Sequence, residues 1–324
     1  MKRVFAIVLC LITVAALFSG CAGEPETLKF GSAVYVGAPA VTDATADKDG
    51  SGKLDVTVAA VTVDADGKIV ACALDTASST VGFTAAGKAV ANTEFKTKYE
   101  LGKDYNMVAY GGATKEWFEQ ADAFEALVAG KNLDEVKALV AEENKGNDEV
   151  VKAGCTIMIN EFVGAIEKAY NAAAASEVTA EDTLKVTAAT EQVCTDATAD
   201  KDGSNKVSTY VFATALNADG KAVAAASDCV EVSFSFDLKG ASTLDTTKAV
   251  TSKKEQGKDY GMVAFGGAEK EWFEQAAAFD AACIGKDAKE ISGLVGDDGK
   301  GAEDLQKAGC TIYVTGFVKA ASKI

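Results

Sequence analysis

The 324-residue chain contains no histidine and only two tryptophans. Without histidine it cannot form a Ser-His-Asp or Cys-His catalytic group, nor a metal site that uses imidazole. Its cysteines form no C-x-x-C pair, so the ligand spacing typical of zinc and iron–sulfur sites is missing as well. No pairing of a nucleophile with a base stands out, and we therefore predict that the protein is not an enzyme.

Positive charge is also scarce, because 32 Lys and Arg stand against 48 Asp and Glu, for a formal net charge of −16. The basic residues form no cluster. We expect no nucleic-acid partner, since a phosphate backbone requires a basic surface. The acidic excess favours a soluble protein, and an attraction for cations is the alternative.

The start of the chain has the pattern of an export signal. Lys2 and Arg3 precede an apolar run at 4–18 that is too short for a spanning helix, which predicts a signal peptide over 1–20. The string FSGC, ending at Cys21, resembles the lipobox of bacterial lipoproteins, with Phe in place of the usual Leu. The resemblance implies a lipid on Cys21 that anchors the protein to the outer leaflet of the cytoplasmic membrane, at the cell surface. A plain secretory signal or a membrane anchor stays open.

A long internal repeat dominates the rest of the chain. GKDYNMVAYGGATKEWFEQADAF at 102–124 returns at 257–279 with 19 of 23 positions identical. TDATADKDG occurs at 42–50 and 195–203, and KAGCTI occurs at 152–157 and 307–312. This spacing is far longer than a solenoid repeat and predicts two tandem copies of one domain. The predicted parts are a tether at 21–29, domain 1 at 30–172, an Ala-rich linker at 173–183 and domain 2 at 184–324.

Each copy is predicted to be α+β, with an antiparallel sheet packed against about three helices. Residues 53–75 have the pattern of a hairpin around an Asp-Gly turn, and 81–90 of a further strand pair. Residues 155–159 are expected to form a short buried strand. Apolar spacing and capping residues, among them Asn132 and Asn160, predict helices at 115–128, 132–139 and 160–173.

Six cysteines follow Cys21 in the sequence. Only Cys155 and Cys310 stand at matching positions of the repeat, so no disulfide framework common to both copies is visible. We expect buried free thiols, although export would permit disulfides.

The repeated segment supplies the candidate ligand site. It combines aromatic and polarizable side chains with a Gly-Gly turn ahead of a helix, a setting that suits a small planar ligand. The candidate residues are Tyr105, Met107, Gly111, Gly112, Trp117 and Gln120 in the first copy, and Tyr260, Met262, Gly266, Gly267, Trp272 and Gln275 in the second. The alternative is that Trp117 and its neighbours belong to the core. Thr114 becomes Glu269 in the second copy, so a hydroxyl there is not shared.

A second candidate site is the acidic loop TADKDGSGKLD at 45–55. Asp47, Asp49 and Asp55 resemble the oxygen ligands of a D-x-D-G calcium loop. An ordinary Asp/Gly turn without a metal is the alternative.

Strings such as ADKDG, GKDYGM and KEWFEQAAAF resemble tandem-repeat surface lipoproteins of anaerobic Firmicutes, a group whose role is unsettled. A weaker resemblance is to the FMN-binding domain family, through ADGKI at 65–69 and AGCTI at 153–157. That family implies FMN as a cofactor, with Thr156 and Thr311 as its attachment points. Three functions stay open: a non-enzymatic binding module for a small ligand, an extracellular flavin electron carrier, and a structural protein of the cell envelope.

Overall fold

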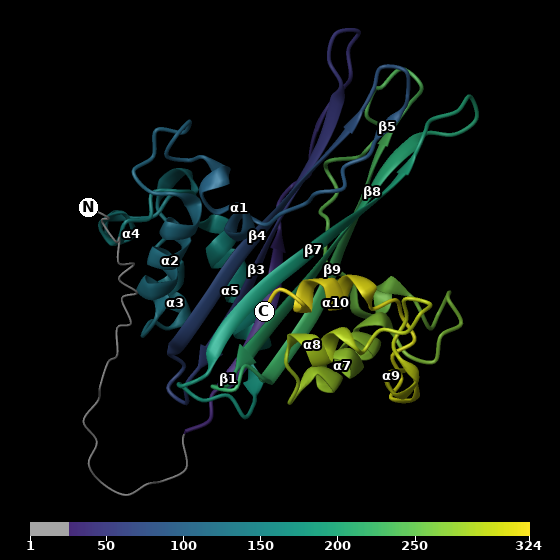
Figure 1. The fold of residues 1–324 in the computed structure, drawn as a ribbon. Coiled ribbons are helices and arrows are strands. Elements are labelled where there is room, and N and C mark those ends of the chain that lie inside the picture. The colour runs from purple at the N-terminus through teal and green to yellow at the C-terminus, as the bar shows by residue number, and fades with distance from the viewer. Residues whose placement is uncertain (1–25) are drawn as a thin grey trace, which may run out of the picture.

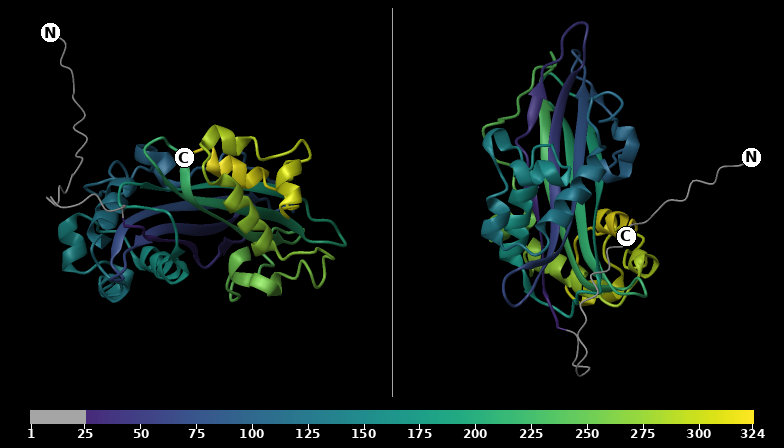
Figure 2. Two further views of the ribbon diagram at one scale, coloured as in Figure 1. Left: turned by 90° about the horizontal axis from the view of Figure 1, so that it is seen from below. Right: turned by 90° about the vertical axis from the view of Figure 1, so that its left-hand side faces the viewer.

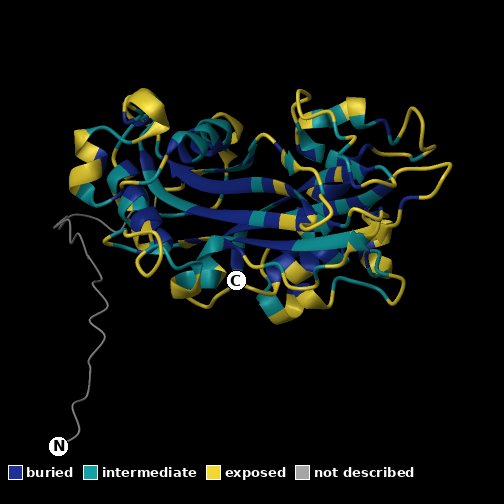
Figure 3. Cartoon of the chain, turned by 90° about the horizontal axis from the view of Figure 1, so that it is seen from above, coloured by how far each residue is buried: buried dark blue, intermediate teal, exposed yellow. Residues whose placement is uncertain are grey.

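The computed structural model describes residues 26–324, so the predicted signal peptide and Cys21 lie outside the described residues. This part of the chain is a mixed α+β fold of two antiparallel sheets and ten α-helices. The sheets pack face to face, and helices cover the outer face of each (Figures 1 and 2). The layers follow the order helix, sheet, sheet, helix, with the buried strands in the middle (Figure 3).

The strands belong to two sheets that are antiparallel throughout, as predicted. The first sheet has the order β5-β4-β3-β1-β6, with β2 paired to β3, and the second has the order β7-β8-β9. The strands of the first sheet are β1 (Lys29–Val36), β2 (Ala40–Thr42), β3 (Gly50–Val63), β4 (Ile69–Phe83), β5 (Ala89–Val90) and β6 (Ala174–Ala175). Those of the second are β7 (Thr183–Thr195), β8 (Gly203–Leu216) and β9 (Ala222–Phe236).

The predicted hairpin is β3–β4, and β5 adds the predicted short strand pair at its far end. Ala59 and Val61 of β3 face the helices, whereas Val56 and Val58 face the second sheet. Because both faces are covered, this part of the strand is apolar at nearly every position instead of alternating with polar residues.

The helices are more numerous and shorter than predicted. The first half of the chain has α1 (Lys98–Leu101), α2 (Trp117–Val128), α3 (Leu133–Lys137), α4 (Asp148–Ala153) and α5 (Asn160–Ala172), with 3-10 turns η1 (Gly102–Tyr105) and η2 (Glu142–Asn144). The second half has α6 (Lys253–Gln256), η3 (Gly257–Tyr260), α7 (Trp272–Cys283), α8 (Ala288–Ser292), α9 (Glu303–Lys307) and α10 (Thr315–Ala321). The three predicted helices of the first half correspond to α2, α3 and α5.

Two local predictions are wrong. Residues 155–159 form no strand but a turn between α4 and α5, with a single bridge from Met158 to Lys145. Cys155 and Ile159 are buried while Met158 is 63% exposed, so the apolar run does not lie inside a sheet. Asn160 is the first residue of α5 and does not cap it, because Ile159 stands at the cap position.

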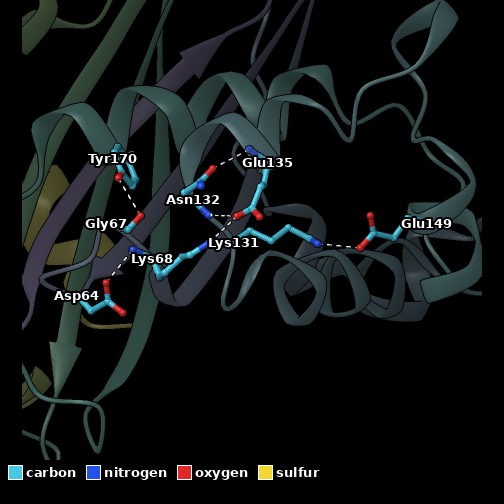
Figure 4. Close-up of polar contacts among 8 residues, drawn as sticks. All are labelled: Asp64, Gly67, Lys68, Lys131, Asn132, Glu135, Glu149 and Tyr170. Carbon is cyan, nitrogen blue, oxygen red and sulfur yellow. Dashed lines mark hydrogen bonds and ion pairs between the residues drawn. The ribbon is translucent and has the colours of Figure 1, made fainter.

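The turn of the β3–β4 hairpin is tied to the helical layer by polar contacts (Figure 4). Lys68 pairs with Glu135 of α3 at 2.7 Å, and the Tyr170 hydroxyl of α5 donates to the Gly67 carbonyl at 2.9 Å. Asn132, a predicted capping residue, forms a capping box with Glu135 at the start of α3. These contacts hold the outer helices in register with the hairpin.

Contacts between the two halves occur in pairs. We call two residues equivalent when the sequence repeat aligns them, which means 153 residues apart in the strands (83 and 236) and 155 apart in the helices (117 and 272). The equivalent residues Phe83 and Phe236 stack on each other with ring centroids 4.6 Å apart. Lys323 pairs with Glu100 at 2.7 Å, and the equivalent pair Lys168–Glu255 is also formed.

Backbone contacts follow the same rule. The Ala44 amide donates to the Gly240 carbonyl at 2.8 Å, and the Ala197 amide donates to the Gly87 carbonyl at 2.8 Å. Because each contact returns when the two halves are exchanged, the halves pack about an approximate two-fold axis that passes close to the Phe83–Phe236 stack.

The predicted linker at 173–183 is docked on the fold. Its Val178 is fully buried, and the Val178 carbonyl accepts the Leu28 amide at 2.7 Å. The six cysteines within residues 26–324 are free, and four of them are buried. The expected burial is wrong for Cys194, which is exposed, and for Cys72, which is half-buried. None of the helices in this described part of the chain combines the length and apolar character needed to cross a bilayer.

Candidate functional site

The structure brings four of the predicted site residues together. Tyr105, Met107 and Trp117 line a cavity of about 240 Å³ on the outer side of the first half, and so does Asp55 of the calcium candidates. Trp117 is only 3% exposed and packs edge-on against Phe162 at 5.6 Å. The ammonium of Lys98 lies 5.5 Å from the centroid of the Trp117 ring, so a cation of the chain itself already occupies the aromatic surface.

The second half repeats this arrangement. Trp272 is 4% exposed and packs against Tyr260 and Phe317. Lys253 lies 5.0 Å from the Tyr260 ring centroid and 5.8 Å from that of Trp272. Met262 is packed beside the same core. In both halves the tryptophan is therefore a core residue, and binding of a planar ligand to it stays a prediction.

A buried carboxylate explains why the segment is so well preserved between the halves. Glu116, directly before α2, accepts the amides of Met107 and Val108 at 2.9 and 3.4 Å. The equivalent Glu271 accepts those of Met262 and Val263 at 3.0 and 3.3 Å. The carboxylate thus pins the loop ahead of the helix, and it neutralises the positive end of the helix dipole.

The Gly-Gly turn belongs to the same loop and is exposed. Gly112 has φ +69° and Gly267 has φ +68°, the left-handed region that favours glycine. A Cβ on Gly111 or Gly266 would lie 2.7 Å from the carbonyl oxygen of Met107 or Met262. The glycines are required by the turn itself and do not line the cavity beside Trp117.

Gln120 and Thr156, predicted for separate reasons, bind each other. Gln120 Oε1 accepts the Thr156 amide at 2.8 Å and the Thr156 hydroxyl at 3.0 Å. Gln275 and Thr311 repeat both bonds at 2.8 and 2.9 Å. Each glutamine anchors the turn that precedes the last helix of its half, and flavin attachment at either threonine stays a prediction.

The structure does not bring the three calcium candidates together. Asp47 and Asp49 lie exposed in the loop before β3, whereas Asp55 lies within β3, where Ser78 donates to it and Lys53 pairs with it at 3.3 Å. Among residues 26–324, no group of three or more His, Cys, Asp or Glu is placed to hold a metal ion. Thr114 and Glu269 are both exposed.

A larger cavity lies where the two halves meet, and the sequence did not reveal it. We call it the interface cavity; its volume is about 460 Å³. It is lined from the first half by Ala73, Leu74, Asp75, Thr97, Tyr99, Glu100, Asp122 and Glu125, and from the second by Leu184, Lys185, Val186, Thr187, Ala188 and Lys323. The volume falls within the range of small-molecule sites.

Three carboxyl groups of the interface cavity have perturbed acidity. Burial raises the pKa of Asp75 to about 7, although hydrogen bonds from Thr97 and Thr76 oppose the shift. Burial raises the pKa of Glu125 to about 8, opposed by the Leu74 amide, which Glu125 accepts at 2.6 Å. Burial also raises the pKa of Asp122, which accepts the Tyr99 hydroxyl. None of the three forms an ion pair within the described chain.

The equivalent position of the second half is closed. It lies between β9 and β1, where a space of only about 10 Å³ remains. Asp280 also lines a separate cavity of about 640 Å³, on the side of β9 that faces residues 174–177. Asp280, the equivalent of Glu125, pairs with Lys254 at 3.0 Å and accepts the Ser227 hydroxyl at 2.5 Å. Lys254 and Ser227 replace Tyr99 and Leu74 of the first half. A lysine of the chain itself therefore occupies in one half the position that is open in the other.

Sequence reasoning missed the interface cavity because it concentrated on identical positions. The cavity arises where the halves differ, at Tyr99 against Lys254 and at Glu125 against Asp280. The second half has a lysine, Lys254, where the first half has Tyr99, whereas both halves have an acidic residue at the Glu125 position. This difference between the copies was the signal that could have indicated the cavity.

Comparison with known protein families, with characterised proteins and with solved structures gave no match to this chain.

Proposed function

We propose that the protein is a surface-anchored lipoprotein made of two copies of one domain, and that it binds a small ligand in the interface cavity without transforming it. The main support for this proposal is the cavity of about 460 Å³ that both halves line. A mostly apolar wall with a few converging polar groups is the usual make-up of a ligand site. The paired contacts across the approximate two-fold axis support the two-copy organisation.

A cavity-filling variant tests the binding site. Ala73→Phe places a ring in the interface cavity, and Ala126→Phe adds the same ring on the exposed side of α2 as a control. We expect a compound that raises the unfolding temperature of the wild type to lose this effect with Ala73→Phe and to keep it with Ala126→Phe. Equal effects on all three proteins would refute the cavity as the binding site.

The anchor is tested separately, on the FSGC string. We expect Cys21→Ala to move the protein from the membrane fraction to the soluble or secreted fraction. Retention of the variant at the membrane would contradict lipid anchoring through Cys21.

Acid–base catalysis is the second candidate, because Asp75 and Glu125 share the cavity and both have a raised pKa. The two candidates separate when a bound compound is incubated with the protein and analysed by mass spectrometry. Recovery of the compound unchanged supports binding, and conversion that is lost in Glu125→Gln supports catalysis.

A further inference from the structure

Lys254 of the second half acts as an internal model for a ligand of the first. Its ammonium group pairs with Asp280 at 3.0 Å, in the position equivalent to Glu125. Tyr99 is the residue of the first half equivalent to Lys254, and its hydroxyl donates a hydrogen bond to Asp122. Glu125 is left with one backbone partner, the Leu74 amide, and faces an open cavity.

We propose that the interface cavity binds a primary aliphatic amine, whose ammonium group pairs with Glu125 as Lys254 pairs with Asp280 in the second half. This inference rests on the proposed function and adds the chemical class of the ligand.

The charges around the cavity fit a cationic guest. Lys323 is already engaged, because it pairs with Glu100 at 2.7 Å and donates to the Ala188 carbonyl at 2.6 Å. This leaves three carboxyl groups against one exposed lysine, Lys185. A charge-assisted hydrogen bond to a carboxylate is about twice as strong as a neutral one.

The remaining wall fits an alkyl chain. Ala73 and Leu74 on one side, and Leu184 and Val186 on the other, offer apolar surface from both sheets. A metal ion is a poorer fit, since the described residues contain no group of three or more His, Cys, Asp or Glu arranged to hold one.

Binding of an ammonium group is expected to depend on pH. In the empty cavity burial favours the protonated carboxyl of Glu125, with a pKa of about 8, and a cation at this position favours the ionised form. Binding should therefore release protons near neutral pH and tighten as the pH rises from 6 to 8. The titratable and charged groups that face the site are Asp75 of β4, Tyr99 and Glu100 of α1, Asp122 and Glu125 of α2, Lys185 of β7, and Lys323 after α10. The Cys72 thiol of β4 also interacts with the charge of Glu125, after burial the second cause of its raised pKa.

The experiment compares three probes of equal length, hexylamine, hexanol and hexanoate, by titration calorimetry with the mature protein. We expect hexylamine to bind at least about ten times more tightly than either analogue, because only the amine satisfies the carboxylate. Calorimetry in buffers of different ionisation enthalpy measures the proton release.

Two cavity variants and one control locate the amine. Glu125→Gln keeps the size of the side chain and removes its charge, and it should weaken hexylamine binding at least about tenfold. Tyr99→Lys reproduces the second half and should abolish binding, because its own ammonium reaches Glu125. Asp134→Asn removes an exposed charge on α3 and should change nothing. Trp fluorescence confirms that each variant is folded.

The outcomes distinguish a wrong class of ligand from a wrong ligand site. If hexanol or hexanoate binds as well as hexylamine, and Ala73→Phe removes that binding, the cavity is a ligand site but the amine class is wrong. Hexylamine binding that survives Glu125→Gln or Tyr99→Lys also overturns the inference. If none of the three probes binds the wild type, the amine inference is overturned. The proposed function is then decided by the other compounds, which should stabilise the wild type and should not stabilise Ala73→Phe.

Discussion

The stacked pair Phe83–Phe236 offers a direct test of how the two halves hold together. Both rings are fully buried, with centroids 4.6 Å apart and planes at 6°. They come from the ends of β4 and β9, one from each half. The perturbation is replacement of either ring by alanine, and of both together.

The structure sets the size of the effect. Removing a fully buried phenylalanine costs about 3–5 kcal/mol of unfolding free energy, through lost burial and the space left behind. The two rings also contact each other, and a stacked aromatic pair contributes about 0.5–1.5 kcal/mol beyond its burial. The double variant should therefore cost less than the sum of the single ones by roughly that coupling energy. Phe265→Ala, which removes a ring that is 91% exposed, should cost less than about 0.5 kcal/mol.

The assay is urea unfolding followed by tryptophan fluorescence. Each half has one tryptophan. The fluorescence of Trp117→Phe therefore reports on the second half alone, and that of Trp272→Phe on the first half alone. We expect coincident transitions in the wild type, because the halves share a buried interface. Phe83→Leu and Phe236→Leu serve as milder substitutions where alanine unfolds the protein. A loss below about 1 kcal/mol for either alanine variant, or separate transitions for the two tryptophans, would refute a common core.

Three further predictions follow from buried polar and thiol groups. Glu116→Ala should cost about 1–3 kcal/mol, because the Met107 and Val108 amides lose their acceptor, and hydrogen exchange at these amides should speed up while the second-half loop is unchanged. The pKa of Glu125 rises from 4.5 to about 8 on folding, so its contribution to stability is complete below pH 4.5 and is lost as the pH rises through 8. The unfolding temperature measured from pH 5 to 9 should show this loss, and the loss should be smaller in Glu125→Gln. Cys194, the exposed thiol of the described chain, should react with maleimide before the buried cysteines, and peptide mapping that finds a buried one labelled first would contradict the packing.

Local structure was predicted well where a single segment carries its own signal. The β3–β4 hairpin follows from an Asp-Gly turn between β-branched runs, and α3 follows from the capping box of Asn132 and Glu135. The strand predicted at 155–159 was wrong because a five-residue apolar run is ambiguous. Its backbone is held by the Gln120 side chain, and no neighbouring strand pairs along it.

The packing of the halves could not be predicted, because it depends on contacts between residues far apart in the sequence, such as Lys168 and Glu255, which are 87 positions apart. Nothing near Glu125 in the sequence indicates that β7 will cover it, or that Lys323 will reach Glu100. The aromatic candidates follow from the repeated segment, its Gly-Gly turn and its residue types, and these features do not separate a core tryptophan from a ligand-binding one. The structure decides between these by placing Lys98 over the ring and Phe162 at its edge.

The comparison of the halves separates requirements of the fold from requirements of function. Glu116 and Glu271 make the same bonds to the same loop, so their identity follows from what the loop needs in order to fold. Tyr99 and Lys254 stand at equivalent positions of one architecture, yet one leaves a carboxyl group facing an open cavity and the other neutralises its counterpart. With no cation beside it, Glu125 keeps its proton up to a pKa of about 8, so the first half holds a neutral carboxyl group where the second half holds an ion pair. The proposed amine site depends on this difference, which is why the difference between the halves bears on function more than their identity does.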